Sequence, residues 1–251
     1  MSEQLANQEE KKVALLIDGD NAQPSLIEKM LAEAGKFGTI TIRRIYGDWT
    51  MANMNSWKAT LNNHAIQPIQ QFRYTVGKNA TDSALIIDAM DILHRGLVEG
   101  FCIVSSDSDY TRLATRIREA GIFVMGIGEK KTPKAFVNAC KVFIYTENLT
   151  EKEPVPKPRQ VARKDVHEED EGLPPDPLPL LKQAFEMAVG EDGWAHLGTI
   201  GTFLLQIDPG FDPRTYGFKQ LSQLIKAYSK LFEVRCLDDT GPTALYVKRR
   251  Q

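Results

Sequence analysis

The sequence has few cysteines and no long hydrophobic run. Its three cysteines, Cys102, Cys140 and Cys236, lie far apart and show neither CxxC nor Cys/His spacing, which argues against a disulfide framework and a zinc site. The longest apolar run near the N-terminus, residues 13–17, is far shorter than the roughly 20 residues that span a bilayer. We therefore expect a protein of the reducing cytoplasm that has no membrane partner.

Two further absences concern charge and glycine-rich motifs. The 31 Lys and Arg residues are balanced by 33 Asp and Glu residues, so the chain lacks the excess positive charge that coats nucleic acid, although a local basic stripe can still bind phosphates. Neither G-x-x-x-x-G-K-[ST] nor G-x-G-x-x-G occurs, which counts against an NTPase and against a dinucleotide-binding enzyme. The overall composition, 42% hydrophobic and 25% charged, is that of an ordinary globular protein.

One segment divides the chain. Residues 150–177 hold six of the thirteen prolines and a run of acids at 168–171, with almost no large hydrophobic residue. Such a composition is typical of a flexible linker that is too poor in apolar area to order itself. It predicts an N-terminal domain at 11–149 and a smaller C-terminal domain at 178–251.

The N-terminal part alternates short β-branched runs with helical segments, which predicts an α/β fold: a doubly wound parallel sheet with helices on both faces. Pro24 marks the start of the first helix, and Ser25 to Glu28 forms a competing capping box. A last apolar run at 142–145 either adds an edge strand or packs on the sheet. The expected strands lie at residues 13–18, 39–47, 66–72, 101–107 and 122–128.

The C-terminal part has a different pattern. Apolar residues recur at helical spacing in three segments, 178–188, 197–207 and 218–228, and two alternating segments around residues 232–234 and 245–247 flank a turn. Three helices followed by a β-hairpin predict a small winged helix-turn-helix domain.

Carboxylates follow the predicted strands. Asp18 ends the first strand, Asp107 ends the fourth, and Asp109 lies two residues further on. Asp82 begins the helical run TDSALIIDAMDIL. Because strand C-termini and helix N-termini share one edge of a parallel sheet, and because the first and fourth strands adjoin in a doubly wound sheet, we expect these four acids to converge beside Asn21.

Such a cluster favours a divalent cation. Neighbouring carboxylates oppose one another's ionisation, and Mg²⁺ or Mn²⁺ resolves that conflict, activates water and stabilises a leaving oxygen. The pattern therefore indicates metal-dependent hydrolysis of nucleic acid. The alternative is that each Asp caps the helix after it, which fits Asp20 better than Asp18. Asp88 and Asp91 lie further down their helix and are expected to be structural or exposed.

Basic residues predict where a phosphate chain would run. Lysines in the loops after the strands could steer it, although solvation explains them almost equally well. A second group lies in the C-terminal domain, where three lysines share one expected helical face and Arg214 extends it. The alternative is that an amphipathic helix simply needs a polar face. Tyr216 either stacks on a base or packs in the domain. The lysines are Lys78, Lys130, Lys131 and Lys134 in the first group and Lys219, Lys226 and Lys230 in the second.

The segments LLIDGDN (15–21), YGDW (46–49), KNATDSALIIDAMDIL (78–93), SSDSDY (105–110) and ACKVFIYTENL (139–149) resemble the NYN domain, the LabA-like branch of the PIN-type nucleases. The resemblance covers nearly all of residues 11–149 and implies a PIN-like fold with an acidic site. That site would fall on Asp18, Asp82, Asp107 and Asp109, with Asn21 beside it. Lys141 departs from the pattern, which has an acid there.

Residues 178–250 resemble the OST-HTH or LOTUS domain, most clearly in DPRTYGFKQLSQLIKAYSKLFEV (212–234). This resemblance implies RNA as the partner. Together the residues and the resemblances predict a Mg²⁺- or Mn²⁺-dependent endoribonuclease that acts on single-stranded or structured RNA. The alternative is a non-catalytic RNA-binding adaptor with the same fold; a small-molecule phosphatase is weaker, since no covalent-nucleophile motif occurs. The oligomeric state, including a homodimer, stays open.

Overall fold

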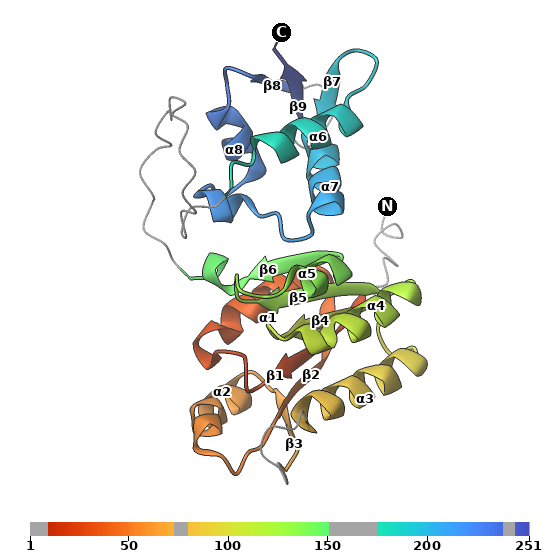
Figure 1. Ribbon diagram of the computed structural model, residues 1–251, viewed down its shortest axis with the longest axis vertical. Coiled ribbons are helices and arrows are strands. Elements are labelled where there is room, and N and C mark those ends of the chain that lie inside the picture. The colour runs from red at the N-terminus through yellow and green to blue at the C-terminus, as the bar shows by residue number, and fades with distance from the viewer. Residues whose placement is uncertain (1–9, 73–79, 151–174, 238–243, 251) are drawn as a thin grey trace, which may run out of the picture. The chain divides into compact units, whose positions relative to one another are not determined.

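The computed structural model describes residues 10–72, 80–150, 175–237 and 244–250. It forms two compact units, one ending at Thr150 and the other comprising the described residues from 175 onward (Figure 1). The N-terminal unit carries a parallel sheet with helices, and the C-terminal unit carries three helices and a small antiparallel sheet. In the part of the chain described here, no helix is long and apolar enough to cross a membrane.

The N-terminal sheet has the strand order β3-β2-β1-β4-β5-β6, and every neighbouring pair is parallel. This confirms the predicted α/β fold and places the first strand beside the fourth. Residues 142–145 form an edge strand that pairs with β5, which settles the alternative left open by the sequence. The strands are β1 Lys12–Asp18, β2 Thr39–Gly47, β3 Gln67–Gln70, β4 Gly100–Val104, β5 Phe123–Gly128 and β6 Val142–Tyr145.

Helices flank this sheet. Their bounds are α1 Ile27–Gly35, α2 Lys58–Asn63, α3 Ala80–His94, α4 Thr111–Glu119 and α5 Lys134–Ala139. Pro24 opens a short 3₁₀ turn before α1, but the predicted capping box does not form. The reason is that the cap position falls on Gln23, two residues before Ser25, so Ser25 lies inside the turn and makes no capping hydrogen bond.

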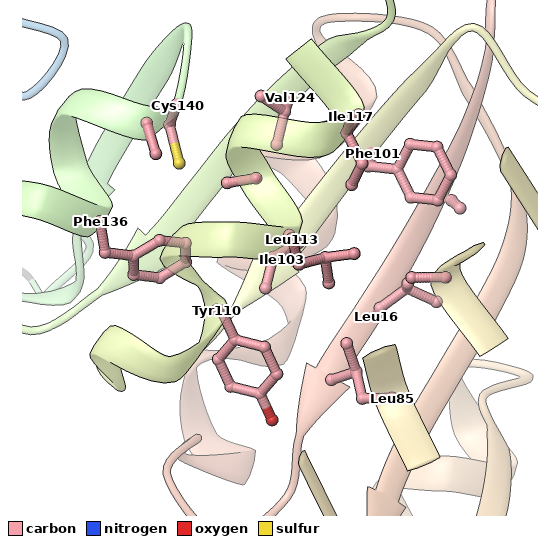
Figure 2. Close-up of a cluster of buried hydrophobic side chains, with 14 of the residues drawn as sticks. Leu16, Leu85, Phe101, Ile103, Tyr110, Leu113, Ile117, Val124, Phe136 and Cys140 are labelled. Atoms are coloured by element: carbon pink, nitrogen blue, oxygen red, sulfur yellow. The ribbon is translucent and has the colours of Figure 1, made fainter. Parts of the chain in front are cut away.

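One hydrophobic core of the N-terminal unit lies between the sheet and helices α3, α4 and α5. Strand residues such as Leu16 and Ile103 meet Leu85 of α3 and Leu113 of α4, and all are buried (Figure 2). The alternate strand residues point to the opposite face, because successive side chains of a strand face opposite ways. There α1 contacts β1 and β2. Each large side chain buried here stabilises the fold by about 1.5–3 kcal/mol.

Glycine lets the edge strand approach closely. A Cβ atom at Gly126 of β5 would clash with the ring of Phe143 on β6, and at Gly128 it would lie 2.5 Å from the carbonyl oxygen of Ser105. The ring of Phe143 therefore lies directly against the backbone of β5. This close approach keeps the end of β5 beside the loop that follows β4.

The C-terminal unit contains α6 Leu178–Ala188, α7 Leu197–Ile207 and α8 Leu221–Ala227, with the antiparallel strand order β7-β9-β8. The predicted helices and hairpin are present, the hairpin as β8 Phe232–Leu237 and β9 Ala244–Arg249. The sequence pattern missed β7, Trp194–His196, because three residues are too few to show an alternation. Leu181, Phe185, Leu204 and Val247 belong to a separate hydrophobic core.

Candidate functional site

The site lies at the C-terminal edge of the central strands. Strand β1 ends at Asp18, and β4 ends at Val104 and leads through Ser105 into a loop that holds Asp107. A 3₁₀ turn, Ser108–Tyr110, follows this loop. Because β1 and β4 are hydrogen-bonded neighbours, their ends lie side by side. Helix α3 carries Asp82 in its first turn and brings it to the same edge.

Three carboxylates converge there. Asp82, Asp107 and Asp109 each offer an oxygen atom, and these three atoms lie within 4.8 Å of one another. Asp82 and Asp107 are half-buried, whereas Asp109 is exposed. The set consists only of carboxylate oxygens, the donors that Mg²⁺ and Mn²⁺ prefer. The residues therefore fit a hard divalent cation.

The electrostatics of Asp82 support this fit. Burial raises the pKa of Asp82, and the charges of Asp107, Asp109 and Asp20 raise it further, against the lowering effect of a hydrogen bond from Tyr110. Ionised carboxylates at this edge therefore repel one another. A bound cation would relieve that repulsion.

Asp18 lies apart from the three. It is fully buried, and its Oδ2 atom accepts hydrogen bonds from Asn21 Nδ2 at 2.6 Å and Ser105 Oγ at 2.8 Å, while the backbone N–H of Asp20 donates to Oδ1. Burial raises the pKa of Asp18, the hydrogen bonds oppose this, and the charge of Asp82 adds to it. Asp18 is thus close enough to interact electrostatically with Asp82, although it is not one of the three clustered carboxylates. We call this buried carboxylate the base of the site.

Asn21 is exposed and makes its side-chain hydrogen bond to Asp18. Asp20 does not cap the following turn, whose cap residue is Gln23, so the capping interpretation of Asp20 is wrong. Asp20 is exposed, and its charge acts on Asp82 instead.

Asp107 has both roles that the sequence left open. Its Oδ1 atom accepts a hydrogen bond from the backbone N–H of Asp109 at 2.9 Å, so it caps the 3₁₀ turn, while its carboxylate also belongs to the cluster. Ser105 fixes this loop, since its Oγ atom accepts from the N–H of Asp107 and donates to Asp18. The buried Ser105 side chain therefore links the base of the site to its outer carboxylates.

Sequence reasoning missed Tyr110. This side chain is fully buried in the core beneath α3, α4 and α5, where Figure 2 shows it, and its hydroxyl donates to Oδ1 of Asp82 at 2.7 Å. Burial, with the nearby acids, raises the pKa of Tyr110 well above its usual value, so the hydroxyl keeps its proton. Its place directly after the DSD motif was the only signal in the sequence.

A second carboxylate of α3 has a different environment. Asp88 accepts a hydrogen bond and ion pair from Arg44 Nη1 at 2.6 Å and a hydrogen bond from Tyr46 Oη at 2.5 Å. Burial and the bond to Asp88 raise the pKa of Tyr46 well above its usual value. Asp88 thus joins α3 to β2, as expected of a structural residue, and Asp91 is exposed.

The predicted basic residues of the N-terminal unit are placed as follows. Lys131 pairs with Glu129 at 2.7 Å, and Lys134 is the exposed first residue of α5. Lys130 is exposed, and its backbone N–H donates to the carboxylate of Glu147. Lys78 lies outside the described residues.

The expected basic helical face of the C-terminal unit is wrong. Helix α8 spans only Leu221–Ala227, so Lys226 lies on it, whereas Lys219 precedes it and Lys230 follows it. Arg214 is held by a forked ion pair with the buried Asp212, at 2.7 Å and 2.9 Å to Oδ2. Tyr216 packs against the core of the unit.

The fold and the site define an α/β protein of the PIN-like type, with an acidic cluster at the C-terminal edge of its sheet and a small helical domain after it. The family model of the NYN domain matches residues 12–149, and the chain belongs to that family. The OST-HTH/LOTUS domain matches residues 174–243. This pair of domains points to a function on RNA.

No curated protein matches the chain. Among solved structures, it is similar to a protein of unknown function from Vibrio parahaemolyticus, at 17% identity over 55% of this chain and 94% of that one, with a TM-score of 0.47. It is also similar to an uncharacterized protein of Nitrosomonas europaea, at 31% identity over 41% of this chain and 92% of that one, with a TM-score of 0.29. Neither is assigned an activity.

Proposed function

We propose that this protein is a metal-dependent endoribonuclease of the LabA-like type. The observation that carries the proposal is the convergence of the carboxylates of Asp82, Asp107 and Asp109 within 4.8 Å of one another, from two separate segments of the chain. The NYN and OST-HTH/LOTUS domains supply the second support, because together they point to RNA.

In this proposal Asp82, Asp107 and Asp109 hold Mg²⁺ or Mn²⁺, and Asp18 completes the negative charge at the base of the site. A bound divalent cation would polarise the phosphodiester and lower the pKa of an attacking water. The buried hydroxyl of Tyr110 fixes the orientation of the Asp82 carboxylate. Ser105 and Asn21 do the same for Asp18, and hydrogen-bonded carboxylates of this kind keep ligands in place.

Single-stranded or structured RNA is the proposed substrate. The exposed Lys130 and Lys134 follow β5, whose C-terminal end lies at the same edge of the sheet as the acidic cluster. Their charges would attract the phosphate chain, and this attraction would weaken with added salt.

A second candidate is an RNA-binding adaptor that binds without cleavage. It is favoured by the burial of Asp18, which removes that carboxylate from direct contact with solvent. Both functions use the same fold, so only a measurement of RNA cleavage can distinguish them.

The test is cleavage of labelled single-stranded RNA, hairpin RNA and single-stranded DNA by the full chain in Mg²⁺, Mn²⁺ or EDTA. Asp107→Asn is the test variant, and the matched control is Asp91→Asn, which changes an exposed acid elsewhere on the N-terminal unit. Metal-dependent RNA cleavage that is lost in the first variant and kept in the second supports the nuclease. RNA binding with no cleavage in any metal selects the adaptor.

A further inference from the structure

The small sheet of the C-terminal unit has one face turned to the core and one turned away from it. Ala195 of β7, Val247 of β9 and Phe232 of β8 are buried in the hydrophobic core of this unit. Because successive residues of a strand alternate between faces, their neighbours along each strand lie on the opposite face.

That outer face carries aromatic and cationic side chains in two rows across the three strands. Residue pairing places Trp194, Lys248 and Glu233 in one row and His196, Tyr246 and Arg235 in the next. His196, Lys248 and Arg235 are exposed, and the other three are half-buried. The face therefore presents three rings, two permanent cations and one acid.

The rings and cations are already organised. The guanidinium of Arg235 lies 4.8 Å from the ring centre of Trp194, and Nζ of Lys248 lies 5.6 Å from it. The rings of His196 and Tyr246 meet edge to face with their centres 5.4 Å apart. Glu233 pairs with Arg235 at 2.8 Å, so Lys248 is the cation of this face that has no acidic partner among the described residues.

We propose that this outer face, made of Trp194, His196, Arg235, Tyr246 and Lys248, is a binding platform for single-stranded RNA. It rests on the proposed function of the chain on RNA and names the surface that would hold the substrate. Unstacked bases lie on the aromatic rings, and Lys248 and Arg235 attract the phosphates between them. Sheets that expose aromatic side chains stack two or three single-stranded bases in this way.

The chemistry of this face selects its occupant. Rings that stack on bases need bases that are free of a partner strand, so the platform favours single-stranded RNA over a duplex. Among the described residues, the lysines near α8 make no comparable contact with an aromatic ring. They offer positive charge alone, which would bind single-stranded and duplex RNA alike. A preference for single-stranded RNA therefore distinguishes binding at the outer face of the small sheet from binding at the lysines near α8.

The experiment measures binding of a short labelled poly-uridine RNA to the full chain by fluorescence anisotropy. EDTA is present throughout, so the result does not depend on cleavage, and a failed nuclease leaves it intact. Trp194→Ala is expected to weaken binding about 5- to 150-fold, the range for loss of a stacked base. Trp194→Phe keeps a ring and should retain most of the affinity.

Two comparisons sharpen this test. Met187→Ala, which truncates a side chain that is 47% exposed on α6, is the matched control and should leave affinity unchanged. Lys248→Ala should weaken binding and reduce its salt dependence. Circular dichroism and thermal unfolding report whether each variant folds.

Photo-crosslinking of 4-thiouridine RNA to the unmodified chain decides the matter even where Trp194→Ala fails to fold. Crosslinks to peptides that contain Trp194, His196 or Tyr246 support the platform. Crosslinks confined to other peptides overturn it, as would unchanged affinity in folded Trp194→Ala and Lys248→Ala. Absence of any binding of the wild-type chain to single-stranded RNA would also overturn it.

Discussion

Helix α3 carries two aspartates whose surroundings are opposite. Asp88 meets a guanidinium and a tyrosine hydroxyl, so its charge is neutralised within the protein. Asp82, six residues earlier, meets a tyrosine hydroxyl and the carboxylates of Asp107 and Asp109. Both receive a hydrogen bond from a buried tyrosine, so the difference lies in the sign of the neighbouring charge.

This difference separates a structural carboxylate from one prepared for a ligand. A paired carboxylate stabilises the fold, and the loss of its partner leaves an unsatisfied group. A carboxylate among like charges works against the fold until a cation from outside neutralises it. The following substitutions exchange or remove these features.

The largest effect is expected for Asp82→Asn. The amide keeps an oxygen that can accept the hydrogen bond from Tyr110 but removes one anionic ligand. We expect metal-dependent RNA cleavage to fall about 100-fold or more, since cation binding supplies several kcal/mol of charge stabilisation. Steady-state kcat/KM across a Mg²⁺ series measures this. Cleavage that survives at the wild-type rate would show that Asp82 holds no catalytic cation.

Asp88→Ala should act on stability instead. It removes the partner of Arg44 and Tyr46, and we expect the free energy of unfolding to fall by about 2 kcal/mol. Urea denaturation measures the change, with Asp91→Ala, an exposed residue of the same helix, as control. Equal stability of the two variants would mean that the Arg44–Asp88–Tyr46 network does not fasten α3 to β2.

The two tyrosines form a matched pair. Tyr110→Phe removes the donor to Asp82, and we expect the affinity for Mn²⁺ to fall about 10-fold, the scale of losses behind metal ligands. Tyr46→Phe removes the donor to Asp88 and should leave that affinity unchanged. Calorimetric titration with Mn²⁺ compares them. Equal losses in both would indicate a general disturbance of α3.

The smallest effect concerns Asp109→Asn in EDTA. Burial and neighbouring acids raise the pKa of Asp82 in the folded state, so the folded chain binds more protons than the unfolded chain between the ordinary Asp pKa of about 4 and the raised value. The contribution of Asp82 to stability therefore falls as the pH rises from the ordinary pKa of Asp through the raised pKa of Asp82.

Removing the charge of Asp109 should reduce this loss and raise stability by about 0.5 kcal/mol near neutral pH. Thermal unfolding against pH measures it. Added Mg²⁺ should stabilise the wild-type chain more than this variant. A variant that is less stable than wild type in EDTA would contradict the repulsion between these acids.

The sequence predicted the fold and most of the edge, but not the internal order of the site. Strand and helix alternation was enough to place β1 beside β4, because parallel crossovers follow few topologies. Periodicity cannot say which hydroxyl meets which carboxylate, so Ser105 and Tyr110 were missed. It also could not separate the buried Asp18 from the outer acids.

The errors in the C-terminal part have a similar origin. The apolar spacing at 218–228 predicted a helix through Lys219 and Lys226, but only the segment Leu221–Ala227 is helical. Capping and turn geometry determine where α8 begins and ends, and the pattern of apolar residues does not show this geometry. The outer face of the small sheet depends on β7, which the pattern also did not show.

The separation of the hydrophobic cores of the two units has a consequence for cooperativity. The core beneath α3, α4 and α5 and the core around Leu204 belong to different units, and no buried residue is shared between them among those the structure describes. A protein whose two units have separate cores does not meet the conditions for two-state unfolding. A single unfolding midpoint would then describe neither unit. A calorimetric scan should resolve two transitions, so that Asp88→Ala shifts one and Trp194→Ala shifts the other.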